Sequence, residues 1–107
     1  MKARDSNGTS IPNGIGVVSP GQSITMECQH QDNILWSRRS VENPERIERL
    51  KDNERMIIKD NILTIHNIRF EDAMVYYCER MGINYRFFLN VYASEFVKFS
   101  FINISGK

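Results

Sequence analysis

Few side chains in this sequence have the type and spacing that catalysis requires. The two histidines, His30 and His66, fall in a predicted loop and on a predicted strand. Serine and aspartate residues are present, but no nucleophile elbow places them for catalysis. The six glycines are scattered among turns and form no loop that could cradle a phosphate. We therefore predict that the protein is not an enzyme and has no cofactor and no small-molecule substrate.

The two cysteines are the most informative feature of the chain. Cys28 and Cys78 lie fifty positions apart, and Trp36, the single tryptophan, lies between them. The second cysteine ends the run Asp-Ala-Met-Val-Tyr-Tyr-Cys, which begins at Asp72. What these cysteines do depends on the elements that position them.

Length and composition limit the class of protein. A chain of 107 residues forms one domain, and 41% hydrophobic with 25% charged residues is ordinary for a globular protein. The 14 basic and 13 acidic residues give a net charge of +1, which argues against a general nucleic-acid or membrane-surface binder. No apolar run approaches the ~20 residues that span a bilayer. The polar start of the chain, residues 1–16, does not resemble a signal peptide, so a secreted protein would be represented here by a mature fragment.

Short runs between frequent turn signals predict strands rather than helices. From Ser23 to Gln29 polar and apolar residues alternate, so Ile24, Met26 and Cys28 share one face of a half-buried strand. The other predicted strands are Ile15–Val18, Ile34–Arg38, Met56–Lys59, Ile62–Ile68, Val75–Arg80 and Tyr85–Tyr92.

Three segments lie outside this regular pattern. The charged stretch from Arg38 to Arg55 favours an exposed edge strand at Arg46–Leu50, although a short helix over 44–56 is also compatible with it. Residues 1–14 read as a flexible leader, because they are polar and contain two glycine turns. Residues 94–107 form a C-terminal extension or a linker to a next domain, and their apolar side chains make free solvation unfavourable.

Together these residues resemble an immunoglobulin-superfamily domain, closest to the I-set and with some V-set character. The resemblance covers roughly residues 15–92, and it implies an all-β, two-sheet antiparallel sandwich with Greek-key topology over residues 15–93. The matching motifs are Pro20–Cys28, Trp36, Leu63-Thr64-Ile65 with Ile68, Asp72–Cys78, Gly82 and Leu89-Asn90-Val91.

The resemblance also implies a role for each scaffold residue. Cys28 and Cys78 would form a buried disulfide covered by Trp36, which leaves no ligand set for zinc and points to an oxidising compartment. Tyr76 would be the tyrosine corner, whose hydroxyl bonds an upstream backbone group. Asp72 would pair with Arg55, and Leu63 and Ile65 would lie in the core.

In this family the sheet of strands C, F and G often carries the interface. If Trp36, Tyr76 and Cys78 point inward, their neighbours along each strand point outward. The candidate protein-binding residues are Leu35, Arg39, Tyr77, Glu79, Arg86 and Phe88. They would form an apolar and aromatic centre with a charged rim, unless the C-terminal tail or a neighbouring domain covers it. The loop from Glu79 to Tyr85 is a second candidate.

The function that the resemblance implies is recognition of a protein. We expect an extracellular domain of a cell-surface receptor or adhesion molecule, binding another Ig-like domain or a different protein ligand, with a homodimer as one possibility. The alternatives are an intracellular I-set module of a muscle or cytoskeletal protein, and a secreted single-domain Ig ligand. Asn7 and Asn103 begin two sequons and are candidate glycosylation sites.

Overall fold

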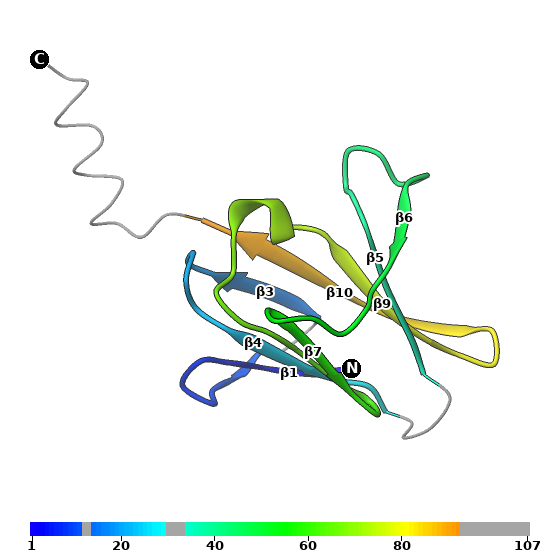
Figure 1. Cartoon of the computed structure of the whole chain (residues 1–107), viewed down its shortest axis with the longest axis horizontal. Helices are drawn as coiled ribbons and strands as arrows, with labels where there is room; N and C mark the ends of the chain where they lie inside the picture. The colour runs from blue at the N-terminus through cyan, green and yellow to red at the C-terminus, as the bar shows by residue number, and fades with distance from the viewer. Residues whose placement is uncertain (12–13, 30–33, 93–107) are drawn as a thin grey trace, which may run out of the picture.

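The protein is a sandwich of two β-sheets, seen in a computed structural model that describes residues 1–11, 14–29 and 34–92 (Figure 1). One sheet has the strand order β2-β1-β4-β8-β7 and the other β3-β10-β9-β5-β6. The strands of the first sheet are β2 (Ser10–Ile11), β1 (Lys2–Asp5), β4 (Ile24–Glu27), β8 (Ile62–Ile65) and β7 (Met56–Lys59). Those of the second are β3 (Ile15–Val18), β10 (Ile83–Val91), β9 (Val75–Arg80), β5 (Leu35–Arg39) and β6 (Ile47–Arg49). The predicted all-β sandwich is confirmed.

The core lies between the two sheets and is built from alternate residues of each strand. The predicted disulfide is present, and it joins Cys28, just after β4, to Cys78 on β9. Trp36 is buried beside these strands, and Tyr76 and Phe87 are fully buried. Each large apolar side chain removed from water in this way contributes roughly 1.5–3 kcal/mol of transfer free energy.

The N-terminal segment differs from our prediction of a flexible leader over residues 1–14. Strand β1 pairs with β4 over four residues, and Ala3 is only 1% exposed within the core. The Asp5 carboxylate accepts hydrogen bonds from the backbone N–H groups of Asn7 and Thr9, both at 2.9 Å, and so orders the turn to β2. Ala3 is the one apolar residue of β1, which is why apolar alternation did not indicate a strand.

The chain then crosses to the second sheet, where β3 runs parallel to β10 as an edge strand. Gly16 faces inward at this point, and a Cβ atom built on it would lie 2.6 Å from Cζ of Phe87. The absence of a side chain therefore lets the backbone of β3 approach the Phe87 ring closely.

The hairpin between β9 and β10 is tighter than predicted, because the predicted strands Val75–Arg80 and Tyr85–Tyr92 left four residues between them. Arg80 pairs with Ile83, so only Met81 and Gly82 form the turn. Both have positive φ, 51° and 81°, as a type I′ turn requires. Because such a turn matches the twist of the flanking strands, β10 begins at Ile83 rather than at Tyr85.

The charged stretch before Arg55 contains the edge strand β6, as predicted, and not a helix. A short 3-10 turn, η1 (Phe70–Asp72), fills the connector before β9. Residues 93–107, and with them the predicted boundary at residue 93, lie outside the described residues. Within the described part of the chain, no helix has the length and apolar character needed to cross a membrane.

Candidate protein-binding face

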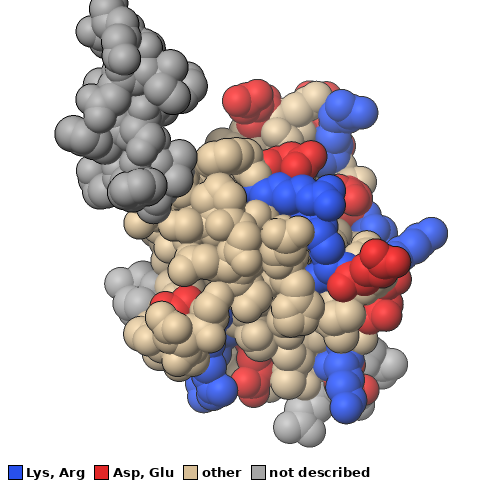
Figure 2. Space-filling model, turned by 60° about the vertical axis from the view of Figure 1, so that its left-hand side comes forward, with Lys and Arg blue, Asp and Glu red and all other residues tan. Residues whose placement is uncertain are grey.

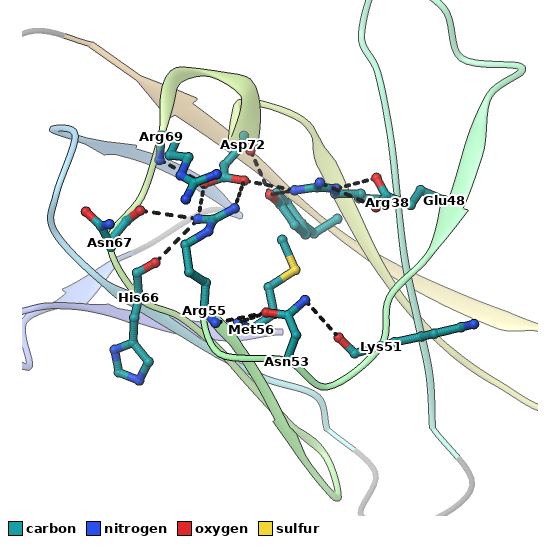
Figure 3. Close-up of polar contacts among 11 residues, drawn as sticks. Arg38, Glu48, Lys51, Asn53, Arg55, Met56, His66, Asn67, Arg69 and Asp72 are labelled. Carbon is teal, nitrogen blue, oxygen red and sulfur yellow. Dashed lines mark hydrogen bonds and ion pairs between the residues drawn. The ribbon is translucent and has the colours of Figure 1, made fainter.

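Strand β5 sends two neighbouring arginines to opposite sides of its sheet. Arg38 points between the sheets and is 9% exposed, whereas Arg39 lies on the outer surface. The inner arginine donates hydrogen bonds to Glu48 at 2.8 Å and to Asp72 at 3.0 Å (Figure 3). Alternation along the strand therefore separates a structural arginine from a surface arginine.

Asp72 lies at the centre of the inner polar cluster and is fully buried. Its carboxylate accepts hydrogen bonds from Arg55 Nη1 at 2.8 Å, from Arg38 Nη1 at 3.0 Å and from the Arg69 backbone N–H at 2.8 Å (Figure 3). Tyr76 Oη donates a 2.7 Å hydrogen bond to the backbone carbonyl of Asp72, which is the geometry of a tyrosine corner. The cluster ties η1 to β5, β9 and the segment before β7.

The ionisation of this cluster follows from burial and pairing. Burial alone would raise the pKa of Asp72, but hydrogen bonds from Arg55, Arg69 and Arg38 outweigh it and lower the pKa below its usual value. Burial raises the pKa of Tyr76 to about 12. The hydrogen bond to Asp72 raises the pKa of Arg55. Asp72 is thus held as a charged anion whose partners are all supplied by the domain itself, which suits a scaffold.

The outer face of the second sheet is organised in rows across its strands. One row contains Arg49, Ser37, Tyr77 and Arg86, from β6, β5, β9 and β10, because each is paired with the next. Two arginines therefore lie at the ends of this row, with a hydroxyl and an aromatic ring between them.

The row on one side of it is mostly apolar, and the row on the other side mixes apolar and polar residues. On one side Ile47, Arg39, Val75, Phe88 and Ile15 are paired in sequence across all five strands. On the other side Leu35 is paired with Glu79, and Glu79 with Asn84. Large side chains are exposed here, since Leu35 is 43% and Phe88 40% accessible.

A shallow hollow of about 170 Å³ lies in this face. Ser37 is the smallest side chain of its lining, which also contains Leu35, Arg39, Ile47, Arg49, Tyr77, Glu79 and Asn84. The Arg39 guanidinium carbon lies 4.9 Å from the centre of the Tyr77 ring, a cation–π contact. Arg39 Nε is buried and has no hydrogen-bond partner among the described residues.

All six candidate binding residues lie on this face, and the structure adds others that we did not predict. Ile47 and Arg49 from β6, and Ile15 from β3, extend it to both edges of the sheet. Their alternation within short edge strands was visible in the sequence, but the sheet and side to which those strands belong was not. In the second candidate region Met81 is 83% exposed at the turn, whereas Tyr85 packs against the core.

A second hollow, of about 370 Å³, lies toward the β3 edge and is uncharged. Its lining is Ile15, Val41, Ala73, Phe88, Leu89 and Asn90. Charge is spread unevenly over the surface that Figure 2 shows. Seen from the left-hand side of Figure 1, a broad area carries no charged side chain, and charged groups gather to one side of it (Figure 2).

The outer face of the first sheet has a different composition. Its outward residues, which alternate with the buried ones, are Lys2, Arg4, Ser10, Thr25, Glu27, Ile57, Lys59, Ile62 and Thr64. None of these described outward residues is aromatic, and lysine supplies two of the three cations. Tyrosine, phenylalanine and arginine are enriched in protein interfaces and lysine is depleted, so the second sheet has the more interface-like face.

We found no grouping that could bind a metal among residues 1–11, 14–29 and 34–92, where no three His, Cys, Asp or Glu side chains come together. His66 is exposed beyond the end of β8, and His30 lies outside the described residues.

Comparisons with known proteins identify the architecture through structure alone. No family model and no curated protein matches the sequence. Among solved structures, the N-terminal four Ig domains of Dscam1 isoform 8.4 match with a TM-score of 0.64 at 20% identity, over 86% of this chain and 26% of that one. The Ig-like domain of human Obscurin-like protein 1 matches with a TM-score of 0.60 at 12% identity, over 87% and 88% of the two chains. This chain has the immunoglobulin fold.

A third match is a structure from photo-crosslinking analyses of multimeric cell-adhesive interactions of VGSC beta subunits. Its TM-score is 0.61 at 15% identity, over 78% of this chain and 97% of that one. The immunoglobulin fold accounts for the disulfide and the tyrosine corner. It does not account for Arg39, Arg49 and Arg86, whose side chains donate no hydrogen bond to another described residue.

Proposed function

We propose that this immunoglobulin domain is an extracellular recognition module of a cell-surface receptor or adhesion molecule. It binds a protein partner through the outer face of β5, β9 and β10. The observation that carries the proposal is the exposure of Leu35 and Phe88 near Tyr77, on a face whose three outward arginines have no carboxylate partner in the described part of the chain. An apolar and aromatic centre with a charged rim is the usual anatomy of a protein interface.

The comparisons support a role in adhesion. The VGSC beta subunit structure is described in terms of cell-adhesive interactions, and another match is named Down Syndrome Cell Adhesion Molecule. A further match is described as parallel homodimers of the extracellular domains of the sodium channel beta4 subunit, with a role in cell-cell adhesion. We infer a role in adhesion for this chain as well, with the exposed outer face as the surface that contacts the partner.

An extracellular location is supported by the disulfide and by the position of one sequon. Disulfides persist in oxidising compartments and are rare in the cytosol. Asn7 is exposed in the turn between β1 and β2, which belongs to the first sheet. A glycan at Asn7 would project away from the proposed binding face, and Asn103 lies outside the described residues.

The test removes the apolar centre without touching the core. We expect Phe88→Asp combined with Tyr77→Ala to abolish staining of a panel of cell lines by tetramers of the domain. The melting temperature should change by less than a few degrees, because both side chains lie on the surface. The matched control is Ile57→Asp with Thr64→Ala on the outer face of the first sheet, which should leave staining intact. Staining that survives the first pair would assign the interface elsewhere.

A second candidate function is an intracellular structural module, which the I-set resemblance of the sequence leaves open. In such a module the cysteines could stay reduced. Mass measurement of the natively sourced protein, with and without reductant, separates the two functions. A shift of two hydrogens on reduction supports the extracellular module, and free thiols before reduction would support the intracellular one.

A further inference from the structure

We infer that the outer face of β5, β6, β9 and β10 binds the acidic surface of a different protein, one that presents carboxylates on either side of an apolar side chain. The inference rests on the proposed function, because both use the same face. It goes further by specifying the chemistry of the partner.

The first step is the charge of the face. Its outward positions contain three arginines, Arg39, Arg49 and Arg86, and one carboxylate, Glu79, which gives a net charge of +2. Among the described residues the ion pairs are Arg38–Glu48, Arg38–Asp72 and Arg55–Asp72, and no outward arginine takes part in them. No ion pair within residues 1–11, 14–29 and 34–92 therefore neutralises the outward arginines of this face.

The second step is the arrangement of the arginines. Arg49 and Arg86 end one row of four paired residues, so three interstrand steps of ~4.8 Å place their backbones about 14 Å apart. Between them lie Ser37 and Tyr77, at the hollow. The planar guanidinium group binds a carboxylate with two parallel hydrogen bonds, so this row matches two separated carboxylates with a smaller or apolar group between them.

Arg39 adds a third donor next to this row. Its guanidinium lies over the Tyr77 ring, which restricts the position of the side chain. Its Nε finds no hydrogen-bond acceptor among the described residues. Buried donors are rarely left without a partner, so the hydrogen-bonding capacity of this arginine is available to a bound acceptor after a small movement of the side chain.

The charge distribution argues against a second copy of the chain as the occupant. Two copies packed face to face would bring six arginines together with two glutamates, and like charges across an interface oppose association. A protein with an acidic surface would neutralise the arginines instead.

The opposite face argues against a purely electrostatic ligand. Lys2, Arg4 and Lys59, with Glu27, also give that face a net charge of +2. A sulfated glycan or an anionic membrane attracted by charge alone would not distinguish the two faces. Only the β5–β9–β10 side combines the charge with Tyr77, Leu35 and Phe88, which favours a protein surface.

The probe is a soluble copolymer of glutamate and tyrosine, titrated into ¹⁵N-labelled domain at low salt, with a lysine–tyrosine copolymer as the reversed-charge control. We expect the glutamate copolymer to shift backbone amide signals of β5, β9 and β10. In Arg49→Gln with Arg86→Gln the dissociation constant should rise at least about tenfold, since two charge-assisted contacts are lost. Glu79→Gln should tighten binding by about twofold, because it removes a repulsive charge.

The matched control is Arg4→Gln with Lys59→Gln, which removes the same charge from the opposite face and should change the dissociation constant by less than about twofold. Equal weakening by the two pairs would overturn the inference, because the attraction would then depend on net charge alone. A heparin tetrasaccharide that shifts the same amide signals with a lower dissociation constant than the copolymer would also overturn it, in favour of a sulfated glycan.

A result from sedimentation equilibrium distinguishes failure of this inference from failure of the proposed function. A dimer that Phe88→Asp dissociates and that Arg49→Gln with Arg86→Gln does not would replace the acidic partner by a second copy, and the proposed binding face would stand. Copolymer-induced shifts confined to β1, β4 and β8 would overturn both.

Discussion

Arg38 and Arg39 are adjacent in the chain, yet they belong to two regions of the molecule with opposite properties. Arg38 lies in a cluster where each charge has a partner, at 2.8 Å to Glu48 and 3.0 Å to Asp72. Arg39 lies on a face where the three outward arginines have no carboxylate partner among the described residues. The inner cluster joins several elements of the fold, whereas we propose that the charge of the outer face serves to bind a partner.

The contrast between Arg38 and Arg39 follows from the period-two alternation of a β-strand, which places neighbouring side chains on opposite sides of the sheet. Removing one partner of a buried ion pair leaves an uncompensated charge, whereas an exposed charge is solvated and contributes little to stability. Stability measurements and binding measurements should therefore respond to different arginines.

The largest expected effect is on the inner cluster. Asp72→Ala leaves Arg38 and Arg55 without their shared carboxylate, and we expect it to lower the free energy of unfolding by about 3–5 kcal/mol. Denaturant unfolding followed by tryptophan fluorescence measures this. The matched outer variant, Glu79→Ala, should change stability by less than ~0.5 kcal/mol. Similar losses in both would remove the distinction between the two regions.

Acid should weaken the same cluster without a mutation. Because the pKa of Asp72 is lowered in the folded state, its contribution to stability is present above the unfolded value near 3.8 and is lost as pH falls below it. The melting temperature of the wild type should therefore decrease more steeply below about pH 4 than that of Asp72→Asn. Parallel profiles for the two proteins would show that Asp72 is not the group responsible.

Alkali should act on Tyr76. Its pKa is raised to about 12 by burial, above the ordinary value of 10.0, so its contribution is present below pH 10 and is lost as pH rises toward 12. Such a rise in pKa corresponds to a stability contribution of up to about 3 kcal/mol. Tyr76→Phe, which loses the 2.7 Å hydrogen bond to the Asp72 carbonyl, should be less stable at pH 7 and less sensitive to alkali. A wild type whose stability is level from pH 10 to 12 would contradict this assignment.

A smaller loss is expected where β3 approaches the core. A Cβ at residue 16 would lie 2.6 Å from the fully buried Phe87 ring, so Gly16→Ala should cost about 1–3 kcal/mol through overpacking. Val17→Ala, one residue along and pointing outward, is the control and should be close to neutral. Thermal denaturation of the two variants compares the inner and outer sides of the same strand. If Val17→Ala proves the more destabilising of the two, the close packing of residue 16 against the Phe87 ring does not limit the stability of this strand.

The smallest effect should come from the outer arginine itself. Arg39→Gln removes one cation–π contact with Tyr77, worth about 0.5–1 kcal/mol at an exposed site, whereas Arg38→Gln should cost several times as much. Calorimetric melting of the pair tests the comparison directly, because the residues are neighbours in the chain. Equal losses at the two positions would contradict it.

The sequence predicted those parts of the fold that depend on local pattern. Alternation placed Tyr77 and Phe88 outward and Tyr76 and Cys78 inward, and the structure has the same arrangement. The Arg55–Asp72 ion pair was predicted from the family resemblance. In the structure Arg55 Nη1 lies 2.8 Å from Asp72 Oδ2.

What the sequence did not predict depends on long-range pairing. Strand β1 buries only Ala3, so the sequence of this segment has no apolar alternation that would indicate a strand paired with β4. The partnership of Arg38 with Glu48 and Asp72 requires residues 10 and 34 positions away. Arg49 joined the outer face because β6 pairs with β5 in one particular register, and no periodicity within three residues specifies a register.

The parallel pairing of β3 with β10 has a mechanical consequence. Ile15 is beside Phe88 and Val18 beside Val91, so tension applied at the start of β3 and at the end of β10 would pull the two strands in opposite directions along their length. Their hydrogen bonds would then be loaded together rather than broken one after another from one end. A domain linked to its neighbours through these two positions would resist stretching before its sheets separate.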